Sequence, residues 1–298
     1  MYFYAARVMY FWSGVDTTIC TAIAEMLAKE KNKHVLVIDL DPQTNATVGL
    51  ISEEKWEQMD EKGQTLAQLF QDRLNGDAAP IFNIKDAIVR GVSSVDGGID
   101  RLELLPSSIR LIDIQEKIPM IALTGNYSAS PLDILKNAVA GVIGRYDYVL
   151  IDCPPSLGTI TKNGLRISSG YVIPTIPDIV STWGIYQIVD AVNRFSADTG
   201  HAVTPLGIVA SKVRGNALHQ RICEDLSRGR LGRFAKANGG VKQPPLFGAR
   251  VPESVDVARG ADVEGGLNTL RQKYGSEPYK ALFALTEEFE QRCQQMIN

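Results

Sequence analysis

Two apolar runs that each end in aspartate constrain the fold of this chain more than any other feature. The first covers residues 35–40 and delivers Asp39 and Asp41, and the second covers residues 148–151 and delivers Asp152. Near-continuous apolar runs of this length are typical of parallel strands that helices cover on both faces. Because parallel strands present their carboxyl ends at one edge of a sheet, we expect all three carboxylates at that edge.

The remaining patterns alternate between strands and helices, which predicts an α/β fold with a doubly wound, mostly parallel sheet and helices on both faces. No internal repeat or low-complexity tract is present, and we expect one domain over residues 1–298 that ends in a C-terminal helix. Strands are expected at residues 8–11, 34–40, 102–106, 148–152, 170–175, 206–211 and 247–251, and helices at residues 17–31, 65–74, 85–89, 130–143, 156–168, 179–195, 218–231 and 277–296.

Composition favours a globular, cytoplasmic protein with no membrane partner. The hydrophobic content of 45% suffices for a buried core, and no apolar stretch approaches the roughly 20 residues that span a bilayer. The N-terminus lacks the basic region, apolar core and cleavage site of a signal peptide. The four cysteines and three histidines have no ligand-like spacing, so we expect neither a disulfide framework nor a zinc site.

Residues 13–18, which read Ser-Gly-Val-Asp-Thr-Thr, connect the first strand to the first helix. One interpretation is an ordinary strand-to-helix turn. The other is a phosphate loop, because the free N–H groups and the dipole of the helix start would face a bound phosphate, and Thr17 would place its hydroxyl on Mg²⁺. Positive charge is missing from this loop, since no Lys occurs between Arg7 and Lys29 and Asp16 stands directly before Thr17.

Basic residues concentrate late in the chain. Residues 207–250 hold nine Lys or Arg against two acids, and residues 228–242 contain no acid at all. This segment is either a solvated helix end followed by a loop, or a surface that contacts DNA phosphates without reading sequence. No helix-turn-helix pattern is evident. Trp12, Trp56 and Trp183 are expected to be packing residues, although Trp12 could also contact nucleotide or a partner subunit.

Three motifs give the chain a specific resemblance. Asp39-Leu-Asp-Pro-Gln-Thr-Asn-Ala-Thr47, Asp152-Cys-Pro-Pro-Ser-Leu-Gly158 and Val251-Pro-Glu-Ser254 resemble, in that order, the motifs of the ParA/MinD group of deviant Walker ATPases. The resemblance covers nearly the whole chain. It implies a single ParA-type ATPase domain that takes ATP and Mg²⁺ as cofactors and closes into a sandwich homodimer in the ATP state.

The loop departs from the family pattern. Family members normally have a loop like Lys-Gly-Gly-Val-Gly-Lys-Thr-Thr, whereas here Phe11 or Trp12 stands at the first Lys position and Asp16 at the second. A Lys elsewhere is then expected to supply the charge. Lys162 is the candidate, and Lys212 is the competing choice, although its position in the family lies closer to the base.

The resemblance implies a role for each candidate residue. Asp41 would position the attacking water, Asp39 would hold Mg²⁺ through water or assist that water, and Asp152 would lie in the outer Mg²⁺ shell. Thr17 would be a metal ligand, and Lys162 would act in catalysis. Residues expected to contact the nucleotide are Ser13, Gly14, Val15, Asp16, Thr17, Thr18, Lys212 and Pro252.

The same resemblance implies how the protein would act. The ATP-bound dimer would hold non-specific nucleoid DNA through Arg228, Arg230, Arg233 and Lys236, and a cargo-bound adaptor protein would stimulate an otherwise slow hydrolysis. A chain that lacks the loop lysines but keeps the aspartates is similar to the ParA-like ATPases that distribute carboxysomes. A plasmid or chromosome partition ATPase and a non-catalytic nucleotide-binding scaffold remain the alternatives.

Overall fold

An eight-stranded sheet organises the computed structural model, which describes residues 6–12, 17–76, 78–121, 130–231, 241–254 and 266–296. The strand order is β3-β4-β2-β5-β1-β6-β7-β8, and every neighbouring pair is parallel except β3 with β4. The predicted doubly wound α/β fold is therefore confirmed. The strands are β1 (Arg7–Trp12), β2 (Val35–Asp39), β3 (Val89–Arg90), β4 (Leu102–Leu105), β5 (Tyr148–Cys153), β6 (Gly170–Thr175), β7 (Thr204–Val213) and β8 (Leu246–Pro252).

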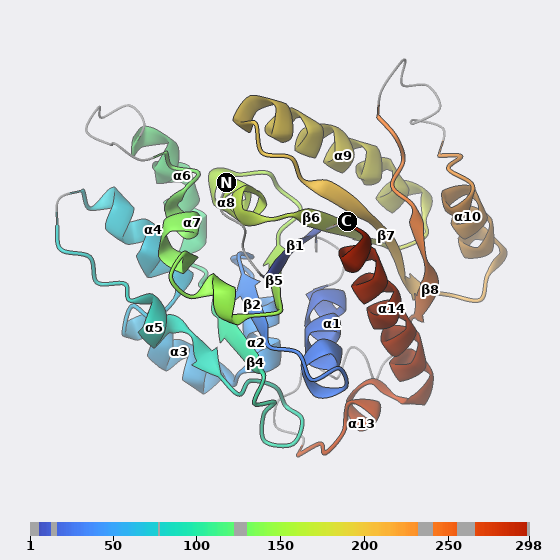
Figure 1. Ribbon diagram of the computed structural model, residues 1–298, viewed down its shortest axis with the longest axis horizontal. Helices are drawn as coiled ribbons and strands as arrows, with labels where there is room; N and C mark the ends of the chain where they lie inside the picture. The colour runs from blue at the N-terminus through green and yellow to red at the C-terminus, as the bar shows by residue number, and fades with distance from the viewer. Residues whose placement is uncertain are drawn as a thin grey trace.

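Helices cover both faces of this sheet (Figure 1), and two hydrophobic cores lie between the layers. One face packs against α1 (Thr17–Lys29), α2 (Asn45–Leu50), α3 (Glu53–Glu61), α13 (Leu270–Tyr274) and α14 (Ser276–Gln295). The opposite face packs against α4 (Leu66–Leu74), α5 (Ile84–Ala87), α6 (Leu111–Ile121), α7 (Ile134–Val139), α8 (Thr159–Ile167), α9 (Ile179–Thr199) and α10 (Ala217–Ser227). We call these the α1 face and the α9 face.

The alternation of strand side chains decides which residue serves which face. On β1, Met9 and Phe11 enter the core of the α1 face, whereas Val8, Tyr10 and Trp12 enter the core of the α9 face. Both sets are buried. This explains why the strand patterns read as continuously apolar rather than alternating.

Several expected elements differ in the structure. The helix expected at residues 130–143 shortens to α7 followed by a 3₁₀ turn at Ile143–Arg145, and the helix expected at residues 218–231 ends at Ser227. Val89, expected at a helix end, pairs with Leu104 in the antiparallel strand β3. The helices α2, α3, α6 and α13 were not predicted. Trp183 is also not a packing residue, because it is 56% exposed.

A buried ion pair ties the C-terminal helices to α1. Glu25 of α1 is fully buried, and its carboxylate lies 2.8 Å from the ammonium of Lys273 on α13. Tyr274 and Ser93 donate their hydroxyls to the same carboxylate. These contacts hold α13 and the 93–95 turn against the middle of α1. Among the described residues, no helix is long and apolar enough to cross a membrane.

Removing one member of this pair should destabilise the fold strongly. We expect Lys273→Met to lower the free energy of unfolding by roughly 3–5 kcal/mol, because Glu25 would be left as a buried charge without its cation. Urea unfolding at pH 7 measures this change. Adding Glu25→Gln should recover much of the loss, since no uncompensated charge then remains. An equal loss in the single and double variants would contradict this account.

Candidate active site

The register of three central strands brings the predicted aspartates together. Asp152 on β5 pairs with Asp39 on β2 and with Phe11 on β1. The N–H of Leu40 also donates to the carbonyl of Asp152 at 2.8 Å. Because Val37 and Leu150, two residues earlier on their strands, face α1, Asp39 and Asp152 project toward the α1 face. Both are fully buried.

Asp39 is a buried carboxylate held by three hydrogen bonds. Its Oδ2 accepts from the N–H of Thr47 at 2.9 Å and from the Thr47 hydroxyl at 2.7 Å, and its Oδ1 accepts from the N–H of Asp41 at 3.0 Å. Burial raises the pKa of Asp39 from 3.8 to about 7, although these hydrogen bonds oppose the rise. The carboxyl group is therefore poised to hold or release a proton near neutral pH.

Asp41 lies at the mouth of the same site. It is 6% exposed, and burial raises its pKa. Within the described part of the chain, the hydrogen bond to its carboxylate comes from the N–H of Gln43, which donates to Oδ1 at 2.9 Å. The Oδ2 atom is thus the oxygen that could orient a water molecule.

Thr47 and Ser107 support the aspartates, and the sequence analysis did not assign either residue a role. Ser107 follows β4; its N–H donates to the Thr47 hydroxyl at 3.0 Å, and its hydroxyl donates to the Asp41 carbonyl at 2.6 Å. Trp56 in turn donates its indole N–H to the Ser107 carbonyl at 3.0 Å. Thr47 stood within the first aspartate motif, but Ser107 carried no sequence signal beyond its place after a strand.

The start of α1 lies beside these carboxylates. Thr17 and Thr18 form its first turn and are half-buried. Cys20, one turn further, is buried, and desolvation together with the nearby Asp152 raises the pKa of its thiol. The second turn of α1 therefore lies near Asp152, at the edge of the sheet where the phosphate-loop hypothesis places a nucleotide. The predicted contacts Ser13, Gly14, Val15 and Asp16 lie outside the described residues.

The positions that hold the first loop lysine in the family belong to the strand here. Phe11 is fully buried on the α1 face, and Trp12 is 5% exposed on the α9 face. The indole N–H of Trp12 donates to the carbonyl of Pro155 at 3.1 Å. Neither side chain carries a positive charge, and both are packed in the hydrophobic cores.

The candidate replacement lysines lie on other elements than the aspartates. Lys162 is half-buried in the first turn of α8, which packs on the opposite α9 face. Lys212 is the second-last residue of β7 and lies in the left-handed region at φ 49°. The hydrogen bond from Arg214 is the main cause that lowers the pKa of Glu253, and the charge of Lys212 contributes to the same shift. Pro252 pairs with Val213. Lys212 and Pro252 thus share the carboxyl edge of the sheet, with β6 between β7 and β1.

The structure describes part of the basic segment, and three of its residues, Arg228, Arg230 and Lys242, are exposed. Gln243 joins the segment to the end of α10, because its side chain donates to the Leu226 carbonyl at 2.7 Å and accepts from the Leu231 N–H at 3.1 Å. The structure thus brings the chain around Lys242 next to the end of α10. The other predicted DNA contacts, Arg233 and Lys236, lie outside the described residues.

The aspartate site could hold a magnesium ion only together with a bound phosphate group, whose oxygens complete the set of ligands. Across the residues that the structure describes, no three His, Cys, Asp or Glu side chains are arranged to hold a metal by themselves. Mg²⁺ is usually bound through one or two carboxylates together with water and substrate phosphates. The two buried carboxylates, Asp39 and Asp152, and the Thr17 hydroxyl supply such a donor set.

The titration of Asp39 should appear in the stability of the metal-free protein. Between pH 3.8 and about 7 the folded state keeps a proton that the unfolded state has released. We therefore expect the free energy of unfolding to rise as the pH falls from 7 to 5, by about 1.4 kcal/mol per pH unit from this group. Asp39→Asn should lack this contribution. Urea unfolding in EDTA measures both slopes.

Asp147→Asn, at the opposite end of β5, provides the matched control. Asp147 accepts from the N–H of His34 near the protein surface, so its replacement should leave the wild-type slope in place. If Asp39→Asn and the wild type show the same pH dependence, Asp39 does not hold its proton near neutral pH.

Comparisons with known proteins agree with this geometry. A family model described as AAA_31, an AAA domain, matches residues 12–204. The sporulation initiation inhibitor protein Soj of Bacillus subtilis is 34% identical over 161 residues, which cover 54% of this chain and 53% of Soj. The chromosome-partitioning ATPase Soj of Treponema pallidum is 27% identical over 59% of this chain and 58% of its own. The chain spans little more than half the length of these curated relatives.

Solved structures share the fold over nearly the full chain. Apo McdA of Cyanothece has a TM-score of 0.70 at 18% identity, covering 95% of this chain and 99% of McdA. Cobyrinic acid a,c-diamide synthase of Mycobacterium smegmatis, with a bound ATP analogue and magnesium, has a TM-score of 0.66 at 22% identity and covers 95% and 93%. Since the family model matches well over half of the chain, this protein belongs to the AAA_31 family of AAA domains, within the ParA/MinD group of ATPases.

Proposed function

We propose that this protein is a positioning ATPase of the ParA type, formed by a single domain over residues 1–298. ATP and Mg²⁺ would bind at the carboxyl edge of the sheet, and two subunits would close on the nucleotide as a homodimer. The observation that carries this proposal is the gathering of Asp39, Asp41 and Asp152 beside the first turn of α1. The magnesium and ATP analogue bound to the cobyrinic acid a,c-diamide synthase support the choice of cofactors.

Each residue of the site would have a separate role in phosphoryl transfer. Bound Mg²⁺ would neutralise charge on the transferred phosphate. Thr17 would hold this ion with its hydroxyl, whereas Asp39 and Asp152, both buried, would act through ordered water. The hydrogen bonds from Thr47 keep Asp39 oriented, so its carboxylate would need no rearrangement when the ion arrives.

Asp41 is the residue that would orient the attacking water. Its Oδ1 is engaged by Gln43, and its backbone carbonyl is held by Ser107. These contacts orient the residue and leave Oδ2 as the carboxylate oxygen that would hold the water. Positioning the attacking water and stabilising charge on the phosphate are the main contributions that a protein makes to this reaction.

Catalysis should be slow in the isolated subunit because the usual loop cation is missing. We propose that Lys162 supplies the charge from α8, with Lys212 as the competing candidate. Since α8 packs on the opposite face of the sheet from the aspartates, Lys162 would act from across the dimer rather than within one subunit. Ser13, Gly14, Val15, Asp16 and Thr18 would contact phosphates, and Pro252 would lie near the base.

The proposed partners follow from the basic segment and from the relatives. Arg228 and Arg230, with Arg233 and Lys236, would hold non-specific DNA, which places the protein on the nucleoid in the cytoplasm. A cargo-bound adaptor would trigger hydrolysis and release. We propose the carboxysome as cargo and an McdB-like adaptor, because the missing loop lysine resembles McdA and the McdA fold matches over nearly the full chain.

A partition ATPase with a plasmid or chromosome as cargo is the second candidate. The name of the Treponema pallidum relative, a chromosome-partitioning ATPase, favours it. The mechanism would be the same, and only the adaptor and cargo would differ. A non-catalytic nucleotide-binding scaffold is less favoured, because Asp41 and its supporting contacts are intact.

Asp41→Ala tests the proposed reaction directly. We expect ATP binding to remain and turnover to fall at least 100-fold, because the water loses its orienting group. The variant should also stay on DNA in the presence of ATP. Steady-state phosphate release and the dissociation rate from a DNA-coated surface measure the two effects.

Asp147→Ala, with its carboxylate at the far end of β5, should hydrolyse ATP like the wild type. Wild-type turnover by Asp41→Ala would remove Asp41 from the reaction. If calorimetry of the wild-type protein with Mg²⁺ detects no uptake of ATP, the whole proposal fails.

Reversing charge in the basic segment tests DNA binding. Arg228→Glu with Arg230→Glu should weaken DNA affinity and lower the slope of log affinity against log salt by about 1 for each lost phosphate contact. ATP binding should remain. Lys55→Glu with Lys62→Glu makes the same charge change at two exposed lysines of and beside α3, and should alter DNA affinity much less. Equal losses in both variants would point to net charge rather than to this surface.

A further inference from the structure

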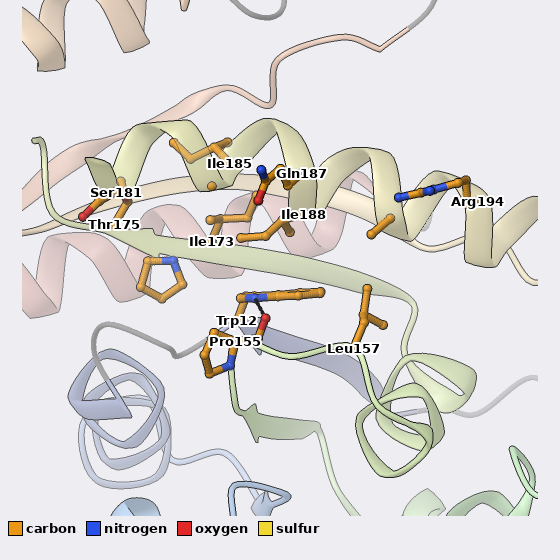
Figure 2. A pocket seen from close by; sticks show the side chains of 13 residues that line it. Trp12, Pro155, Leu157, Ile173, Thr175, Ser181, Ile185, Gln187, Ile188 and Arg194 are labelled. Atoms are coloured by element: carbon orange, nitrogen blue, oxygen red, sulfur yellow. Dashed lines mark hydrogen bonds between the residues drawn. The ribbon is translucent and has the colours of Figure 1, made fainter. Parts of the chain in front are cut away.

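Trp12 connects the end of β1 to the loop that follows Asp152. It is the last residue of β1 and pairs with Cys153, the last residue of β5. Its indole N–H reaches past this pair and donates to the carbonyl of Pro155 at 3.1 Å (Figure 2). A single side chain therefore joins two strand ends at the carboxyl edge, beside the proposed site.

The loop after Asp152 is held at its other end by different elements. The hydroxyl of Thr161 lies 2.9 Å from the carbonyls of Ser156 and Gly158. Gln115 of α6 packs so closely on Gly158 that an added Cβ would meet it at 2.7 Å. These contacts fix the end of the loop nearest α8. The hydrogen bond from Trp12 acts at the beginning, next to the aspartate strand.

The Trp12 ring is nearly buried and lies beside a groove. One side of the ring contacts Tyr10, with 5.6 Å between ring centroids. The other side borders a groove of about 630 Å³ that Ile185 and Ile188 of α9 line from the opposite wall (Figure 2). The hydrogen bond to Pro155 therefore adds a directional polar contact to the apolar packing of this ring.

We propose that Trp12 is a positioning residue for ATP turnover, which rests on the function proposed above. Its hydrogen bond makes the end of β1 and the start of the loop after Asp152 move as one unit. The two strand ends that border the carboxylates then keep their spacing when nucleotide binds and when it is hydrolysed. Trp12 does not contact the reacting atoms and acts only through Pro155.

Trp12→Phe provides the test, because it keeps an aromatic ring in the strand and removes the N–H donor. We expect a kcat five- to tenfold below that of the wild type, as for the loss of one buried hydrogen bond, with KM for ATP changed less than twofold. Trimming the opposite wall of the groove with Ile185→Val should leave kcat within twofold of the wild type. Thermal unfolding of each variant identifies a loss that arises from misfolding.

A second measurement needs no substitution at Trp12. In the wild-type protein, the indole N–H groups of Trp12, Trp56 and Trp183 give three signals in a ¹⁵N-tryptophan NMR spectrum. The signals lost in Trp56→Phe and in Trp183→Phe identify those two residues, which leaves the Trp12 N–H as the third. We expect this proton to be protected from exchange and its signal to move when Mg²⁺ and a non-hydrolysable ATP analogue are added. An unprotected proton, or a signal that stays in place while calorimetry shows the analogue bound, would overturn the proposal.

The outcomes separate this proposal from the function on which it rests. If Trp12→Phe turns over ATP at the wild-type rate, or if Ile185→Val loses as much, Trp12 is not a positioning residue, although the ATPase proposal stands. A parallel rise in KM without a fall in kcat would also overturn the positioning role. Absence of ATP binding by the wild type would overturn both proposals together.

Discussion

The pairing of β2 with β5 is the interaction on which the site depends. Asp39 and Asp152 are register partners, and the N–H of Leu40 continues the ladder to the carbonyl of Asp152. Since side chains alternate along a strand, a slip of one residue would turn one of these carboxylates toward the opposite core. The long apolar runs oppose such a slip, because alternate side chains of each strand pack into the core on each face of the sheet. The same burial that fixes the register raises the pKa of Asp39.

The sequence predicted the parts of this protein that depend on periodicity. The strand at Gly170–Thr175 was predicted with its observed bounds, and the gathering of the aspartates followed from parallel strands alone. Short helices escaped prediction, because α2 and α13 have six and five residues and gain their stability from packing rather than from a long amphipathic pattern. Ser107 escaped for a related reason, since its hydrogen bonds to Thr47 and Asp41 bridge about 60 residues of sequence.

Electrostatics distinguish this site from one with a loop lysine. In the described part of the chain, no Lys or Arg side chain hydrogen-bonds to the carboxylates of Asp39 or Asp41, and the donors are backbone amides and the Thr47 hydroxyl. Neutral donors compensate a buried charge only in part, which is why the pKa of Asp39 stays high. A cation that arrives with the nucleotide would therefore displace a proton as well as bind a charge. The described part of the site thus has carboxylates that could bind a cation, whereas the cation itself would come with the nucleotide.

The two faces of the sheet meet in the loop after β5. The alternation that turns Asp152 toward α1 turns Cys153 toward the α9 face, where Trp12 also lies. Pro155 then receives the indole hydrogen bond at the border of the groove. A shift of Asp152 along its strand must therefore move the Pro155 carbonyl, because only two residues separate them and two of the intervening links are rigid prolyl bonds. Under the proposed function, the Pro155 carbonyl and the Trp12 indole would connect the buried carboxylates on one face to the groove on the other.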